Sequence, residues 1–239
     1  LNKQLPGFGK FLNELGVNAD TVLMGQPLFY QGLFTLLRNT ELQTLKDYLT
    51  FHLIDDDADY LSHDFVDARF AFQRLLTGQS VMKERWKRMT TLVDQQLGEA
   101  LGQFYVQKYF PPEAKSRINE LVENIISTFS ERLKNNDWMS DSTRTKAISK
   151  LRAIVKKVGY PDKWKDYSSV NIVPDDISSN IKATANFNYK RAINKIGKPV
   201  DRSEWCMTPP TSNAYYDPTA NYINFPAGIL QPPFYFVHG

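Results

Sequence analysis

The stretch from Ser212 to Phe234 constrains the fold most, because it combines two short strand-like runs with a well-defined turn. Aromatic and β-branched residues fill the runs Ala214–Tyr216 and Tyr222–Phe225. Between them, Asp217–Asn221 begins with Asp-Pro and continues with small and polar residues, which is typical of a turn. The pattern predicts a β-hairpin with a loop of about five residues.

The residues that follow the hairpin predict a rigid apolar corner. Pro226 should end the second strand, because proline cannot donate a backbone hydrogen bond to the ladder. Ala227-Gly228 allows a close backbone approach, and Pro232-Pro233 keeps the exit extended. The predicted feature is a strand edge beside an apolar corner. On pattern alone, any globular protein could contain such a hairpin.

The chain before the hairpin is predicted to be mainly helical. Apolar residues recur at spacings of three and four through residues 28–37 and 42–51, and a third helix should end at Gly78. The acidic run Asp55–Asp59 lies between these helices. It lacks the alternating ligands, the glycine and the distant glutamate of an EF-hand loop. A solvated loop is therefore expected there in preference to a calcium site.

One long helix carries the clearest apolar stripe of the chain. Gly98 and Gly102, one turn apart on this helix, should let a neighbouring helix approach closely. A stripe of this spacing is expected to belong to the core and not to a cofactor site. Its members are Met82, Trp86, Met89, Val93, Leu97, Ala100 and Phe104.

Three more helices are predicted before the hairpin. One begins at Pro111-Pro112, and its apolar face comprises Ile118, Leu121, Ile125, Phe129 and Leu133. The next is capped by Ser140 and runs through Val158 to Gly159, and the last begins at Asp175 or Asp176. The expected fold is mainly α, with a helical domain over residues 1–199 and the opening of an α+β domain over 200–239. Strand should be confined largely to the region after about residue 200.

Composition excludes several classes of protein. Hydrophobic residues make up 42% and charged residues 23%, as in ordinary globular domains. A net charge of +3 gives little support to nucleic-acid binding. No apolar run approaches the roughly 20 residues that span a bilayer, and residues 1–7 show no secretory signal. The chain lacks an initiating Met, so a processed or excised piece is expected. Cys206 is the single cysteine and is expected to be a small buried hydrophobe.

The hairpin residues closely resemble the neprilysin and endothelin-converting-enzyme family of zinc metalloendopeptidases. The resemblance rests first on Asn213–Tyr216, a short turn and then Phe225–Phe234. It covers nearly the whole chain, in order. Other matching stretches are Arg85-Trp86, Leu97–Gly102, Asp137–Met139, Gly159–Asp162, Lys198–Arg202 and Glu204-Trp205.

The resemblance implies a helical domain that caps a catalytic cleft, followed by the first strands of a thermolysin-like catalytic domain. It also implies that an oligopeptide substrate is held by the side-chain amide of Asn213 and the main chain of Ala214. Ile229 and Phe234 match positions that line the pocket for the residue after the cleaved bond. Both are apolar, as expected for cleavage on the amino side of large hydrophobic residues. Plain core packing is the alternative for these two side chains.

The metal site of the family is not present in this sequence. The family binds zinc through a His-Glu-x-x-His helix and a later glutamate, soon after the region that matches Gln231–Phe234. The histidines here are His52, His63 and His238, and none has a second histidine four residues away. Zinc is therefore expected in the complete enzyme, where it would activate a water with a glutamate as general base. The chain alone, ending in Phe236–Gly239, is expected to bind no zinc and to be inactive.

Competing interpretations remain open at this point. The leading one is a neprilysin-like peptidase that includes the remainder of the catalytic domain, of bacterial type because a cysteine that animal members carry near Met89 is absent. The second is a non-catalytic helical module that binds peptides without a metal site. A helical nucleic-acid binder has only the mild basicity in its favour. The sequence downstream of Gly239 would separate the first two. A periplasmic or cell-surface location is favoured over a cytoplasmic one.

Overall fold

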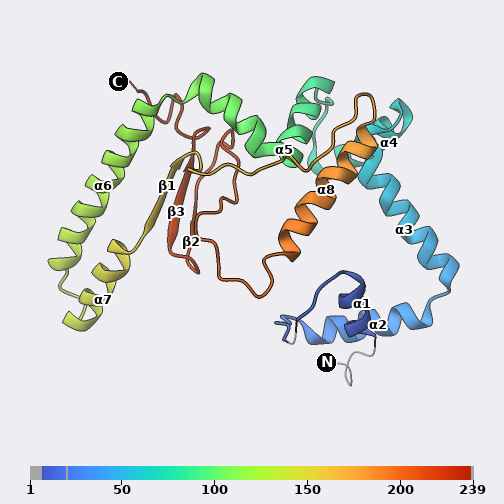
Figure 1. The fold of residues 1–239 in the computed structure, drawn as a ribbon, viewed down its shortest axis with the longest axis horizontal. Coiled ribbons are helices and arrows are strands. Elements are labelled where there is room, and N and C mark those ends of the chain that lie inside the picture. Colours follow the sequence, from blue (N-terminus) through green and yellow to red (C-terminus); the bar gives the residue numbers. More distant parts are fainter. Residues whose placement is uncertain (1–6, 20, 238–239) are drawn as a thin grey trace. The chain divides into compact units, whose positions relative to one another are not determined.

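The computed structural model describes residues 7–19 and 21–237, so His238 and most of the opening stretch lie outside the described residues. The chain forms two units (Figure 1). The first consists of residues up to Arg85 together with Val170–Val200, and the second of Trp86–Ser169 together with the residues from Asp201 onward. The units change between Val200 and Asp201, and residues 86–169 are grouped with the C-terminal part. The division into a cleft cap and a catalytic domain stays a prediction.

The first unit is helical. Gly78 ends α4 in the left-handed conformation, with a φ of 71°, as the sequence predicts. Asp176 caps α8 by accepting a hydrogen bond from the Ser179 N–H at 3.0 Å. The elements are α1 (Phe8–Glu14), α2 (Pro27–Asn39), α3 (Leu42–Asp57), the 3-10 turn η1 (Ala58–Tyr60), α4 (His63–Thr77) and α8 (Ile177–Ile193).

The acidic run Asp55–Asp59 is not the loop that the sequence predicted. It forms the last turn of α3 and the start of η1. The Arg69 guanidinium on α4 lies 3.6 Å from the Asp55 carboxylate and 3.7 Å from the Asp59 carboxylate. This cation lowers the repulsion between neighbouring carboxylates, which explains why a helical conformation is tolerated.

The second unit contains α5 (Arg85–Tyr109), α6 (Pro112–Lys134) and α7 (Asp141–Arg152). α6 begins at Pro112, within the predicted Pro111-Pro112 start, and the Ser140 hydroxyl caps α7 by accepting from the Thr143 N–H at 3.3 Å. Non-helical angles at Leu97 kink α5.

The apolar stripe predicted for α5 does not form a core. Trp86 is 63% exposed, Val93 44% and Phe104 72%. The kink at Leu97 interrupts the helical phase, so residues spaced along an ideal helix no longer share one buried face. Gly98 and Gly102 make room for the Thr208-Pro209 segment, and not for the neighbouring helix that was expected. A Cβ at Gly98 would overlap the Thr208 side chain, and one at Gly102 would lie 2.7 Å from Pro209.

A three-stranded sheet forms the centre of the second unit, in the order β1-β3-β2. β1 (Val155–Gly159) runs parallel to β3 (Tyr222–Pro226), and β2 (Tyr215–Asp217) is antiparallel to β3. The sequence predicted a helix through Val158 and strand largely after about residue 200. The helix prediction is wrong for Val155–Gly159, which form β1. Valines favour a strand when a partner is available, and β3 supplies it from a distant part of the sequence.

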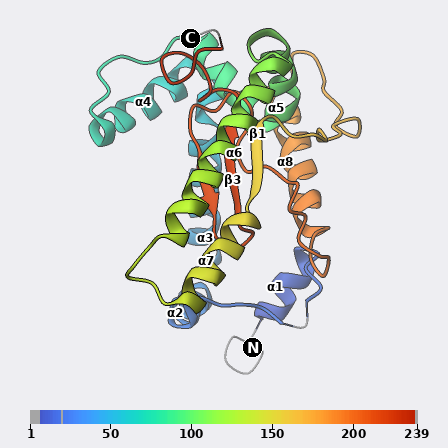
Figure 2. The same cartoon turned by 90° about the vertical axis from the view of Figure 1, so that its left-hand side faces the viewer.

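α6 covers one face of this sheet (Figure 2). Ile118 and Val122 pack with Val158 of β1, and Phe225 of β3 contacts the same cluster. The apolar face predicted for α6 is partly wrong, since Leu121, Ile125 and Phe129 are about half exposed. The buried side of α6 instead passes through Ile118, Val122 and Leu133. The mainly helical fold with a small sheet is confirmed.

Candidate functional site

The outer edge of β2 is the feature that a ligand could use. β2 pairs with β3 through Tyr215↔Asn224, Tyr216↔Ile223 and Asp217↔Tyr222. Within the described residues, β2 is the last strand on its side of the sheet. An edge strand presents backbone N–H and C=O groups that can pair with another extended segment.

Local turn chemistry shapes this edge. The Asp217 carboxylate accepts hydrogen bonds from the Thr219 hydroxyl at 2.6 Å, the Thr219 N–H at 2.8 Å and the Ala220 N–H at 3.1 Å. These bonds, the hydroxyl bond first, lower the pKa of Asp217 below its usual range. Asn221 then adopts a positive φ of 51°, and β3 begins at Tyr222. The predicted hairpin is confirmed, and its Asp-Pro turn explains it.

Asn213 and Ala214 lie immediately before β2. Asn213 is exposed, and its side-chain oxygen accepts a hydrogen bond from the Ala214 N–H at 2.8 Å. Extending the antiparallel register past Tyr215↔Asn224 brings Asn213 to the end of the sheet where Pro226 lies. Two of the four predicted site residues are thus consecutive and lie at the open end of the edge strand.

The corner after β3 is held tightly against the segment that leads to Asn213. The Gly228 N–H donates to the Pro209 carbonyl at 2.8 Å, and a Cβ at Gly228 would overlap the Pro210 carbonyl oxygen. The predicted close backbone approach is therefore confirmed. Because of this contact, Ile229 lies at the same end of the sheet as Asn213.

The two apolar site residues differ in exposure. Ile229 is half-buried, whereas Phe234, farther along the turn, is 73% exposed. The Gln231 side chain closes this turn by donating to the Tyr109 carbonyl at 3.1 Å and the Ala227 carbonyl at 3.2 Å. Core packing within this unit does not account for the Phe234 side chain. Its part in a substrate pocket stays a prediction.

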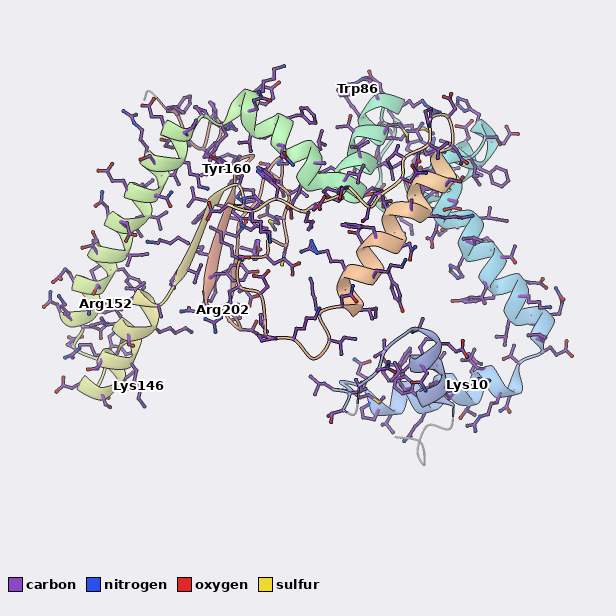
Figure 3. All side chains as sticks on the ribbon, in the orientation of Figure 1. Lys10, Trp86, Lys146, Arg152, Tyr160 and Arg202 are labelled. Carbon is purple, nitrogen blue, oxygen red and sulfur yellow. The ribbon has the colours of Figure 1, made fainter. Side chains whose placement is uncertain are left out.

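Sequence reasoning missed a polar cluster on the sheet face that carries Lys157 and Tyr222. The Lys157 ammonium lies 3.3 Å from the centre of the Tyr222 ring and donates to the Glu204 carbonyl. Burial lowers the pKa of Lys157, and nearby acidic groups, led by Cys206, oppose this shift. The connector from Asp201 to Thr211 crosses this face; in Figure 3, Arg202 marks its beginning and Tyr160 marks the end of β1. Alternation along each strand could have suggested a shared face, but only the register identifies the partners.

Cys206 is exposed, so the prediction of a buried small hydrophobe is wrong. The preceding Trp205, 8% exposed, provides the buried apolar group of this segment instead. The Cys206 thiol lies 3.5 Å from the Tyr222 hydroxyl. The cysteine therefore belongs to the rim of the polar cluster.

The two histidines of the described residues, His52 and His63, do not form a metal site. His52 packs against the Tyr48 ring with centroids 4.4 Å apart, and His63 lies 3.4 Å from the Asp67 carboxylate. Across residues 7–19 and 21–237, no three side chains of His, Cys, Asp or Glu converge to hold a metal ion. His238 lies outside the described residues.

Comparison with known proteins decides the family. The model of peptidase family M13 matches residues 1–161. The chain belongs to peptidase family M13. M13 members are zinc metalloendopeptidases, so the resemblance inferred from the hairpin residues is confirmed at the level of the family.

Relatives of this M13 chain come from bacteria and animals. Neutral endopeptidase of Lactobacillus helveticus is 36% identical over 92% of this chain and 34% of its own length. Human endothelin-converting enzyme 1 is 34% identical over 97% of this chain and 31% of its own length. The open-state structure of zinc metalloprotease Zmp1 from Mycobacterium tuberculosis is 38% identical with a TM-score of 0.86, and the match covers 100% of this chain and 38% of that one.

The M13 chain described here thus spans about a third of the length of the relatives it matches. Among its described helices, none is both long and apolar enough to cross a membrane.

Proposed function

We propose that the complete protein is an endopeptidase that hydrolyses oligopeptides on the amino side of large hydrophobic residues. The observation that carries this proposal is the open outer edge of β2, with Asn213 and Ala214 at its entrance. In this proposal residues 1–199 contribute a cap over the cleft. Residues 200–239 contribute the first strands of the catalytic domain, which the remainder of the protein completes.

The edge would hold a peptide as an added strand. An extended peptide beside β2 exchanges main-chain hydrogen bonds with the edge, and its alternate side chains point into pockets. The Ala214 N–H is already bound to the Asn213 side chain, so the Ala214 carbonyl is the group that would accept from the peptide. Asn213 would then donate from its amide NH₂ group. Holding the peptide straight fixes the bond to be cleaved.

The pocket for the residue after the cleaved bond would use Ile229 and Phe234. An apolar side chain that stays 73% exposed, as Phe234 does, gains free energy when a hydrophobic substrate residue covers it. Ile229 is half-buried at the same end of the sheet as Asn213. A large apolar substrate residue would bury more of this surface than a small or charged one.

Zinc does not fit the described residues, since they provide no converging set of three ligands. We therefore place the zinc ligands and the general base of the proposed enzyme outside these residues. The described residues contribute binding and orientation of the peptide.

The test uses the complete protein with quenched fluorescent peptides that differ only in the residue after the intended cleavage site. We expect turnover of the peptide with Phe or Leu there, little turnover of the peptide with Asp, and loss of all cleavage with a zinc chelator. Equal turnover of all peptides would overturn the proposed specificity. Peptide binding without cleavage by the zinc-loaded protein would instead identify a non-catalytic peptide-binding module.

We also propose a periplasmic or cell-surface location. The support for this proposal is that one relative, 31% identical, is named membrane metallo-endopeptidase-like 1 in mouse. Fractionation of the source cells, with a cytoplasmic enzyme as marker, would contradict the proposal if the protein followed the marker.

A further inference from the structure

Tyr215 connects the edge strand to the connector that precedes it. Its hydroxyl accepts a hydrogen bond from the Cys206 N–H at 3.0 Å and lies 3.2 Å from the Tyr222 hydroxyl. The rings of Tyr215 and Tyr222 meet edge to face, with centroids 5.6 Å apart. Tyr215 is therefore bonded at its tip to two other segments, although its backbone belongs to the exposed edge strand.

The two partners of Tyr215 are themselves firmly held. Tyr222 is 4% exposed and lies beneath the Lys157 ammonium. The connector is anchored beside Cys206 by the buried Trp205 and by the bond from Lys157 to the Glu204 carbonyl. A hydrogen bond to such a fixed support restricts Tyr215 far more than a bond to a mobile loop would.

The hydroxyls of this cluster keep their protons. Burial is the main cause that raises the pKa of both Tyr215 and Tyr222 above the usual value for tyrosine. Both hydroxyls therefore donate and accept throughout the neutral pH range, so the Cys206–Tyr215–Tyr222 chain of bonds is preserved there.

Asn213 and Ala214 depend on this anchor. Tyr215 is the first residue of β2 to pair with β3, so the two residues before it lie beyond the ladder. Behind them, the nearest fixed point is the contact of the Pro209–Thr211 segment with Gly228. We propose that Tyr215 is a positioning residue, whose hydroxyl sets the direction of the Asn213-Ala214 segment against the peptide. This inference rests on the proposed function.

The test compares two tyrosine-to-phenylalanine changes in the complete enzyme. Tyr215→Phe removes the bonds to Cys206 and Tyr222. Tyr189→Phe on α8 is the control outside the proposed peptide-binding edge, because its hydroxyl donates to the Leu15 carbonyl within the first unit. Loss of the two bonds of Tyr215 should lower kcat/KM about 3- to 10-fold. The loss should appear mainly in KM, while Tyr189→Phe stays near the unmodified enzyme. Equal effects of the two changes would overturn the inference.

A double-mutant cycle separates positioning from general destabilisation. If Tyr215 acts through Asn213, Tyr215→Phe should add little in an Asn213→Ala background, whereas independent effects would multiply. Multiplying effects would therefore overturn the inference. The proposed function fails separately, if Asn213→Ala leaves peptide turnover unchanged. If Asn213→Ala lowers turnover and Tyr215→Phe does not, the inference alone fails.

Discussion

The side-chain oxygen of Asn213 accepts a hydrogen bond from the backbone N–H of Ala214 at 2.8 Å. This bond orients the amide at the entrance of the β2 edge, so that its NH₂ group is available as a donor. Because donor and acceptor of the amide then have different tasks, substitutions at Asn213 can separate them.

Asn213→Ala should lower kcat/KM of the complete enzyme roughly 5- to 150-fold, since about 1–3 kcal/mol of polar contacts is lost in a partly dry cleft. Asn213→Asp keeps an acceptor for the Ala214 N–H but loses the NH₂ donor and adds a negative charge. We expect it to be at least as damaging. Peptide turnover and bound zinc should be measured together. A fall in activity that follows loss of zinc would show that the hairpin only supports the metal site.

Gly159→Ala should destabilise the protein by about 2–5 kcal/mol, because two costs combine there. Gly159 has a φ of +79°, and an added Cβ would overlap the ring of the buried Phe110. Gly197→Ala is the control, since Gly197 has a φ of +74° but no atom within 4 Å of the added Cβ. Gly197→Ala should lower the free energy of unfolding only by the cost of holding alanine in the left-handed conformation, about 1–2 kcal/mol. Urea denaturation of both variants gives the comparison, and equal losses would contradict the role of Phe110.

Ser140→Ala should destabilise the protein by about 1 kcal/mol, because the hydroxyl caps the first turn of α7. Ser149→Ala provides the control on the exposed part of the same helix, where alanine favours the helical state. In thermal unfolding, Ser140→Ala should therefore have a lower Tm than the unmodified protein. Ser149→Ala should have an equal or higher Tm. A neutral Ser140→Ala would show that the cap contributes nothing.

Lys157 should make stability depend on alkaline pH. Burial lowers its pKa in the folded state, so between that pKa and the unfolded value of 10.5 the unfolded chain binds more protons. The free energy of unfolding should therefore rise with pH through this window. Below the folded-state pKa both states hold the proton, so the contribution of Lys157 should stay at its lower value there. Lys157→Met should remove this rise, and Lys156→Met controls for loss of a lysine from the same strand. Parallel pH profiles for the unmodified protein and Lys157→Met would contradict the prediction.

Local signals in the sequence predicted the parts of the fold that local chemistry decides. Pro112, Ser140 and Gly78 mark helix ends where they were expected, because each acts through its own backbone or nearest turn. β1 was missed because its valines continue a helical spacing, and its partner β3 lies more than sixty residues later in the chain.

The candidate site, like the fold, was predictable only where local sequence signals decide the structure. The hairpin and the close approach at Gly228 follow from turn residues, whereas the roles of Asn213 and Ala214 came from resemblance to the family. The contacts of Lys157 with Tyr222 and of Tyr215 with Cys206 depend on strand register and on the course of the connector. No local pattern specifies either, so the anchor of the edge strand could not be predicted.

The interleaving of the two units has a consequence for synthesis on the ribosome. The first unit needs Val170–Val200, and β1 of the second unit waits for β3, whose Tyr222 pairs with Val155. Neither unit can therefore close while only the N-terminal half of this chain has emerged. Proteins usually fold domain by domain from the N-terminus during translation. Here the order of segments favours late, nearly simultaneous closure of both units, with β1 exposed to wrong strand partners until then.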